Sequence, residues 1–103
     1  MAERLSQKMV ADEFYEWCIN EDVPCLNKHD GKRGFFLLQY SYGGMQLQYK
    51  SVCGGATGIS SGFVGAREMD TWLKNFDPKS QYAYYRKIEI QRCNDMKKRG
   101  QKK

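Results

Sequence analysis

The chain has little histidine and no long apolar run. Its one histidine among 103 residues, His29, removes most schemes in which an imidazole acts as a general base. No apolar run approaches the ~18 residues that a membrane-spanning helix needs. The first residues, MAERLSQKM, lack the apolar stretch of a signal peptide. We therefore expect a cytoplasmic protein with no membrane partner.

Cysteine is present but not in a common metal-binding pattern. In a reducing compartment the four cysteines are most simply buried thiols. A zinc interpretation would use Cys18, Cys25 and His29, whose spacings are C-x6-C and C-x3-H. Structural zinc sites use C-x2-4-C pairs instead. We expect no metal ligands and no cofactor.

Positive charge is concentrated at the C-terminal end. The net charge is +5, and five basic residues lie within the last seven. In residues 1–96, twelve acidic residues balance twelve basic ones, with an acidic excess in residues 1–30. A hydrophobic content of 41% is that of a folded protein. We therefore expect one globular domain, residues 1–96, followed by a basic flexible tail, residues 97–103.

Two segments place apolar residues at helical spacing. Residues 4–20 carry the stripe Val10, Phe14, Trp17 and Cys18, with Asp12, Glu13 and Glu16 on other faces. The segment GAREMDTWLKNF, residues 65–76, carries the stripe Met69, Trp72, Leu73 and Phe76. Both stripes are expected to face the core.

The segment FFLLQYSYGGMQLQYKSV, residues 35–52, alternates apolar and polar residues around a Gly-Gly pair. We expect a β-hairpin whose two-residue turn is Gly43-Gly44, because both turn positions need a positive φ. This register places Tyr40 opposite Leu47 on an apolar face and gathers the glutamines on the other face.

The last segment, residues 79–96, is ambiguous. Asp77-Pro78 fits a helix N-cap and first helical position, and the Lys/Arg-rich end also favours a helix. Helical spacing groups Tyr84, Tyr85 and Ile88, whereas strict alternation would favour a strand. The fold class is α+β: an N-terminal helix, an antiparallel hairpin or three-stranded meander with a third strand near residues 61–64, and one or two helices.

The glycine-rich segment, residues 53–65, resembles the Gly-x-x-Gly-x-x-x-Gly turn of short-chain dehydrogenase-type nucleotide folds. A phosphate-binding loop would follow a strand buried on both faces and lead directly into a helix. Here the preceding strand alternates, and the next helix begins several residues after the last loop glycine. We therefore expect a flexible connection without a nucleotide.

Catalysis is not expected. Cys53 could pair with His29 as nucleophile and base, but a half-buried thiol at a strand end is the simpler interpretation. Thr57 and Ser60 lie in the glycine-rich loop without a readable Ser-His-Asp arrangement. The chain is predicted not to be an enzyme.

Protein binding is the preferred function. The chain is small, dipolar and rich in tyrosine, and exposed tyrosines favour interfaces. A second copy of the chain, forming a homodimer, is one partner considered. The predicted partner-binding residues lie on the polar hairpin face and in the loop: Gln46, Gln48, Thr57, Ile59, Ser60 and Ser61.

Nucleic-acid binding is the alternative. Basic residues that contact phosphates interleave with tyrosines that stack on bases, ahead of the basic tail. The predicted residues are Tyr82, Tyr84, Tyr85, Arg86, Lys87, Arg92, Lys97, Lys98 and Arg99.

The stretch GGATGISSGFVGAREMDTWLKNF resembles a pattern in small uncharacterised phage and mobile-element proteins. The matching residues are Arg67, Glu68, Met69, Trp72 and Leu73, within residues 35–76. The resemblance implies an accessory protein, an inhibitor or adaptor of a host protein or nucleic-acid-processing machine, in the host cytoplasm. It implies no catalytic residues.

Overall fold

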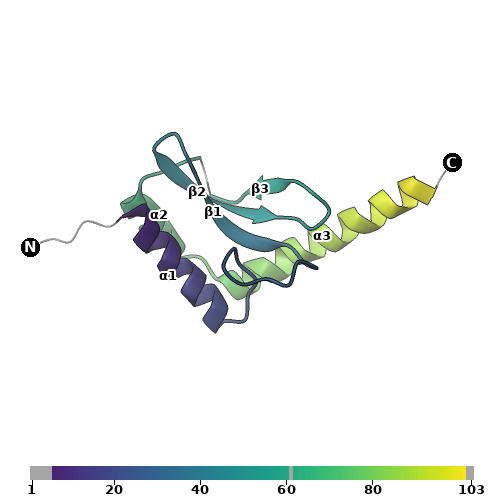
Figure 1. Cartoon of the computed structure of the whole chain (residues 1–103), viewed down its shortest axis with the longest axis horizontal. Helices are drawn as coiled ribbons and strands as arrows, with labels where there is room; N and C mark the ends of the chain where they lie inside the picture. The colour runs from purple at the N-terminus through teal and green to yellow at the C-terminus, as the bar shows by residue number, and fades with distance from the viewer. Residues whose placement is uncertain (1–5, 61, 102–103) are drawn as a thin grey trace, which may run out of the picture.

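The fold is α+β, as the sequence predicts. The computed structural model describes residues 6–60 and 62–101, and side chains up to residue 95. In chain order the elements are α1 (Gln7–Asn20), β1 (Phe35–Ser41), β2 (Gly44–Lys50), β3 (Ala56–Gly58), α2 (Ala66–Leu73) and α3 (Pro78–Gln101). Helices α1 and α2 lie together at one end of the molecule, and the last turns of α3 project from the other end (Figure 1).

Helix α1 has defined ends. Its N-cap is Ser6, whose Oγ accepts the Met9 N–H at 3.1 Å; the predicted start at residue 4 lies outside the described residues. At the other end Asp22 has a positive φ of 62°, and the Val23 N–H donates to the Cys18 carbonyl at 2.8 Å. This is a Schellman-type ending, which turns the chain before Pro24.

The hairpin is confirmed, but the predicted turn and register are wrong. The turn residues are Tyr42 and Gly43, both with positive φ, and Gly44 is the first residue of β2. Tyr40 therefore lies opposite Met45, two residues from the expected partner. A shift of two residues keeps every side chain on its predicted face, so the hydrophobic pattern could not distinguish the two registers.

Contacts from the following segment explain the position of Gly44. A Cβ on Gly44 would lie 2.9 Å from the Phe63 carbonyl carbon and 2.9 Å from the Val64 carbonyl oxygen. Val64 pairs with Met45 through two backbone hydrogen bonds of 2.8 and 2.9 Å. Only glycine leaves room for this close approach.

The sheet has three antiparallel strands in the order β1-β2-β3. The third strand is Ala56–Gly58, so its predicted position at residues 61–64 is wrong. Val64, from the predicted segment, makes an isolated bridge to Met45 rather than a strand. β3 takes the sheet edge because Gly54 and Gly55, both with positive φ, turn the chain back immediately after β2.

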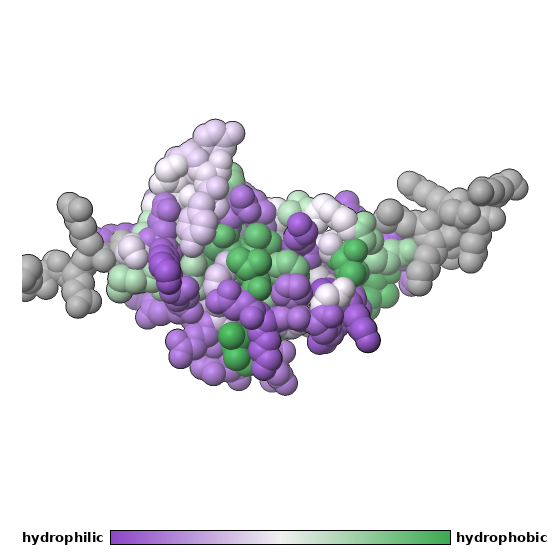
Figure 2. All heavy atoms as spheres, in the orientation of Figure 1, coloured by the Kyte–Doolittle hydropathy of each residue, from purple (hydrophilic) through white to green (hydrophobic). Residues whose placement is uncertain are grey.

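The core lies between one sheet face and the three helices. Phe14 of α1, Phe36 of β1 and Phe76 after α2 form an aromatic cluster with ring centroids 5.5–6.3 Å apart. Both predicted helix stripes contribute to this core, with Trp17 and Trp72 half-buried at its edge. On the face shown in Figure 2, hydrophilic residues predominate and hydrophobic residues lie in small patches between them.

The ambiguous last segment is a helix, α3. It continues to Gln101, so the predicted domain end at residue 96 falls inside a helix; residues 102–103 lie outside the described residues. Of the residues that helical spacing groups, Tyr85 packs against the core, whereas Tyr84 and Ile88 are exposed and Glu89 is buried. No helix in the described part of the chain is both long and apolar enough to cross a membrane.

Candidate functional site

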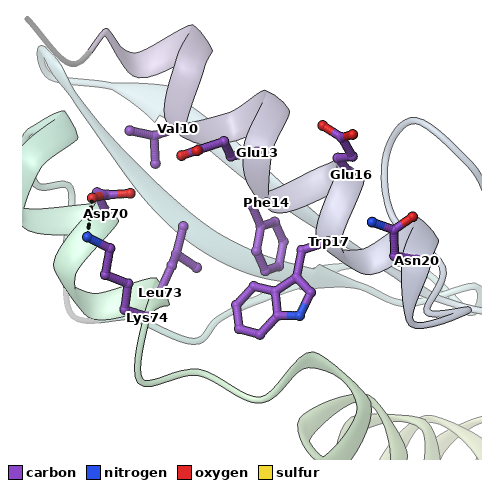
Figure 3. Close-up of a pocket in the computed structure, with 9 residues that line it drawn as sticks. All are labelled: Val10, Glu13, Phe14, Glu16, Trp17, Asn20, Asp70, Leu73 and Lys74. Atoms are coloured by element: carbon purple, nitrogen blue, oxygen red, sulfur yellow. Dashed lines mark ion pairs between the residues drawn. The ribbon is translucent and has the colours of Figure 1, made fainter. Parts of the chain in front are cut away.

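A groove of about 370 Å³ lies between α1 and α2 (Figure 3). Its apolar lining consists of Val10, Phe14 and Trp17 from α1 and Leu73 from α2. Helical spacing puts the α1 residues in one row, and the shared core holds the two helices side by side. Trp17 is half-buried, so one part of its ring packs on the core and the rest faces the groove.

The rim of the groove is acidic. Glu13 and Glu16 of α1 and Asp70 of α2 line it. Glu13 and Glu16 are exposed, so they lie off the buried stripe, as expected, but beside the groove. Asp70 is paired with Lys74 at 3.3 Å, as the i, i+4 spacing favours. Among the described residues, no cation lies within ion-pair distance of Glu13 or Glu16.

The sequence contained a signal for this groove. Glu13 follows Val10 by three residues and precedes Trp17 by four, so it must flank the apolar row of α1. The partner helix could not be inferred, because the packing of α2 against α1 joins segments about fifty residues apart in the sequence.

The predicted partner-binding residues pack mainly on one another. The Ser60 Oγ accepts the Leu47 N–H at 3.0 Å and is buried, and Gln46 Nε2 donates to the Ser60 carbonyl at 3.3 Å. Gln48 Nε2 donates to Gln46 Oε1 at 2.8 Å. These bonds tie the loop to β2. Of the remaining three, Thr57 is exposed on β3, Ile59 is half-buried, and Ser61 lies outside the described residues.

The predicted nucleic-acid residues divide between two faces of α3. Tyr82 and Tyr85 are half-buried: the Tyr82 hydroxyl donates to the Gly34 carbonyl at 3.1 Å, and Tyr85 stacks on Tyr49 with ring centroids 5.6 Å apart. Arg86 is paired with Glu89 at 2.7 Å. The exposed members are Tyr84, Lys87 and Arg92; the side chains of Lys97, Lys98 and Arg99 lie outside the described residues.

A buried carboxylate, not predicted from the sequence, joins α3 to the sheet. Glu89 is 1% exposed, and its Oε1 accepts the Tyr49 hydroxyl at 2.7 Å, the Gly34 N–H at 3.0 Å and Arg86 Nη1 at 2.7 Å. Its Oε2 accepts the Val52 N–H. Burial raises the pKa of Glu89, but these donors outweigh burial and lower that pKa to about 2.

The Glu89 cluster is saturated rather than reactive. Burial and the hydrogen bond to Glu89 raise the pKa of Tyr49 far above its usual range. No buried side-chain nitrogen or oxygen of the described residues lacks a hydrogen-bond partner. Four donors around one carboxylate leave it poorly suited to take up a proton, so its role is structural.

The cysteines form two neighbouring pairs. Cys18 and Cys25 are buried beside each other, and their shared hydrogen bond together with burial raises the pKa of Cys18. Cys53 contacts Ser51 and Cys93 rather than His29, whose ring stacks on Phe35 at 4.1 Å. The Cys53–His29 catalytic arrangement is therefore not formed. The zinc interpretation is no better supported, because the described residues contain no group of three side chains placed to hold a metal ion.

The glycine-rich segment has a conformation unlike a nucleotide-binding turn. β3 interrupts it, and β2, which precedes it, lies in an antiparallel sheet. Nucleotide-binding turns of the type considered join a strand of a parallel sheet directly to a helix. Comparisons with protein-family models, curated proteins and solved structures found no match. The resemblance to phage and mobile-element proteins stays a prediction.

Proposed function

We propose that this protein is a non-catalytic protein-binding domain whose site is the groove between α1 and α2. The observation that carries the proposal is the combination of an apolar floor, formed by Phe14, Trp17 and Leu73, with an acidic rim. The occupant that fits both features is an amphipathic helix of a partner protein, with apolar side chains on one face and lysine or arginine beside them.

Size supports this occupant. A groove of about 370 Å³ has room for a few apolar side chains, which is what a helix presents at i and i+4. Trp17 at the groove edge offers a large area at a low cost in side-chain entropy. Binding would remove its exposed ring surface from water.

Charge supports the same occupant. Glu13 and Glu16 carry negative charge beside the apolar floor, and Lys74 neutralises only Asp70. A basic helix would therefore be drawn to this face, and an acidic one repelled. The proposed biological role is an inhibitor or adaptor of a host protein or nucleic-acid-processing machine in the cytoplasm; it is supported by the phage-protein resemblance.

The test uses two peptide probes with the full chain labelled with ¹⁵N. One probe is an amphipathic helical peptide of leucine and lysine, and the other is its counterpart with glutamate in place of lysine. We expect the lysine peptide alone to shift backbone amide signals of residues 10–20 and 70–74. Equal shifts with both peptides, or shifts confined to α3, would contradict the proposal.

A matched pair of variants sharpens the test. Glu16→Lys reverses a rim charge and should weaken binding of the lysine peptide roughly tenfold. Glu21→Lys makes the same change at the C-cap of α1, at a residue that does not line the groove, and should leave binding within about twofold. Self-association of the chain through this groove, seen by sedimentation, would replace the proposed partner with a second copy.

Direct nucleic-acid binding is the second candidate function. The observation that favours it is an exposed basic and aromatic surface on α3, with Tyr84, Lys87 and Arg92, on a helix that projects beyond the sheet (Figure 1). Fluorescence anisotropy with short RNA and DNA, across a salt series, tests it. If binding is lost when Lys97, Lys98 and Arg99 are all replaced by glutamine, the basic C-terminal end binds nucleic acid non-specifically through its charge. Loss on Tyr84→Ala would mark a stacking site.

A further inference from the structure

The hydrogen bond between Val52 and Glu89 brings two distant cysteines together. Val52 follows β2, and its N–H donates to Glu89 on α3. Cys53 is the next residue along the chain, and Cys93 lies four residues after Glu89 on the same face of α3. The bond thus holds Cys53 over Cys93, although forty positions separate them in the sequence.

The two thiols lie close to each other and are both partly exposed. The Ser51 Oγ lies 3.1 Å from the Cys53 sulfur. The hydrogen bond from Cys93, then that from Ser51, lowers the pKa of Cys53. A lowered pKa increases the thiolate fraction, which is the reactive form.

A reagent can reach this pair. A cavity of about 600 Å³ opens beside it, lined by Cys53, the turn Gly54-Gly55 and Arg92. Both loop glycines have positive φ and open space around their Cα atoms, so the turn is free to adjust as the sulfurs approach. Cys18 and Cys25 are each 0% exposed, so a reagent in solution does not reach them in the folded chain.

We propose that Cys53 and Cys93 are a redox-active pair that closes a disulfide between the glycine-rich loop and α3 on reaction with a hydroperoxide. The Cys53 thiolate attacks the terminal oxygen, the O–O bond breaks, and Cys53 becomes a sulfenic acid as an alcohol or water leaves. The Cys93 thiolate then attacks the sulfenic sulfur, the S–S bond forms, and the S–O bond breaks with hydroxide as the leaving group. The two thiols lose two electrons and the peroxide takes both. The Cys53 proton leaves in the alcohol or water released at the first step, and the Cys93 proton leaves in the water formed from hydroxide at the second.

The disulfide has a structural consequence. It closes a loop of about forty residues and so restricts the unfolded chain. It also fastens α3 to the sheet beyond the Glu89 cluster. We expect oxidation to raise the melting temperature by roughly 10 °C, and a thiol reductant to reverse the rise.

The experiment treats the full chain with stoichiometric hydrogen peroxide and maps its peptides without reduction. The expected product is an intramolecular Cys53–Cys93 link that dithiothreitol removes, with Cys18 and Cys25 still free. A Cys18–Cys25 link, an intermolecular disulfide, or unreacted thiols under conditions that oxidise free glutathione would each overturn the proposal.

Three variants test the two steps. Both cysteines are partly exposed, so serine is expected to leave the fold intact. Cys93→Ser should stop the second step and leave a sulfenic acid on Cys53 that dimedone traps. Cys53→Ser should give neither product, and Ser51→Ala should slow the reaction of Cys53 several-fold by removing a hydrogen bond to its sulfur. If dimedone labels Cys93 in Cys53→Ser as fast as it labels Cys53 in Cys93→Ser, the assigned order of the two cysteines is wrong.

Discussion

The Tyr49 hydroxyl of β2 donates to the Glu89 carboxylate of α3 at 2.7 Å. This bond lies in the contact between the long helix and the sheet, and burial of both partners makes it sensitive to substitution. Ile88 and Ile90 face away from the sheet, so aromatic stacking and this polar cluster hold α3 in place. The attachment of α3 therefore depends on one acidic residue together with the stacked tyrosines.

The first prediction is that Glu89→Ala destabilises the fold. It leaves the Tyr49 hydroxyl and the N–H groups of Gly34 and Val52 without their acceptor, and removes the partner of Arg86. We expect the free energy of unfolding, measured by urea denaturation, to fall by about 3 kcal/mol.

Asp95→Ala is the control for this prediction. It also removes an acidic residue from α3, but Asp95 is exposed, so the change should be within about 0.5 kcal/mol. Equal losses of unfolding free energy in the two variants would show that the buried Glu89 cluster stabilises the fold no more than an exposed acidic residue does.

The second prediction concerns acid. The folded-state pKa of Glu89 is about 2, below its ordinary value of 4.5. The folded state therefore favours the ionised form, and the resulting stability is complete above about pH 5 and lost as the pH falls from 4.5 towards 2. The contribution at neutral pH is on the order of 3 kcal/mol.

Urea denaturation at pH 7 and pH 3 tests this, with Glu89→Gln beside the unmodified chain. All other carboxyls titrate in both proteins, so the difference between the two isolates Glu89. The unmodified chain should lose more stability on acidification than Glu89→Gln. Parallel losses would place the acid sensitivity in other carboxyls.

The third prediction separates the observed hairpin register from the one that the sequence favours. Gly43→Asn should be tolerated within about 1 kcal/mol, because asparagine accepts a positive φ at a turn. Gly44→Ala should cost about 2 kcal/mol or more, because its Cβ meets the backbone of Phe63 and Val64. In the register predicted from the sequence both glycines would be turn residues, and the two changes would have similar effects. Thermal unfolding of both variants distinguishes these outcomes.

The sequence predicted the parts of the fold that depend on local periodicity. The stripes ending at Cys18 and Phe76 bury the residues that their spacing indicates, and the hairpin faces are correct. The turn was misplaced because a two-residue shift preserves every face. The contact between Gly44 and Val64, which selects the observed register, is a tertiary contact without a local pattern.

The site was less predictable, for a related reason. Glu89 lies between two isoleucines, and its burial contradicts the usual preference of glutamate for solvent. Tyr82, Tyr85 and Glu89 do lie at helical spacing in one row that faces the sheet. Glu89 could be assigned to this row only by knowing that the buried Tyr49 hydroxyl needs a hydrogen-bond acceptor there. The groove between α1 and α2 likewise needs the packing of two distant helices.

The last prediction concerns the charge of that groove. Lys74 is 75% exposed and pairs with Asp70, whose side chain is 17% exposed, so the pair contributes about 1 kcal/mol or less to stability. Lys74→Ala should therefore leave the fold intact while freeing Asp70 as a third unpaired rim carboxylate. We expect it to strengthen binding of the leucine-lysine peptide several-fold at low salt, with the gain reduced at high salt.

Lys8→Ala is the matched control, because Lys8 makes the same i, i+4 pair with Asp12 on α1 but does not line the groove. Isothermal titration of both variants at two salt concentrations measures the difference. If the proposed site is correct, Lys74→Ala gains affinity and Lys8→Ala does not. Equal gains would mean that the peptide responds to net charge alone, and that the groove does not select it.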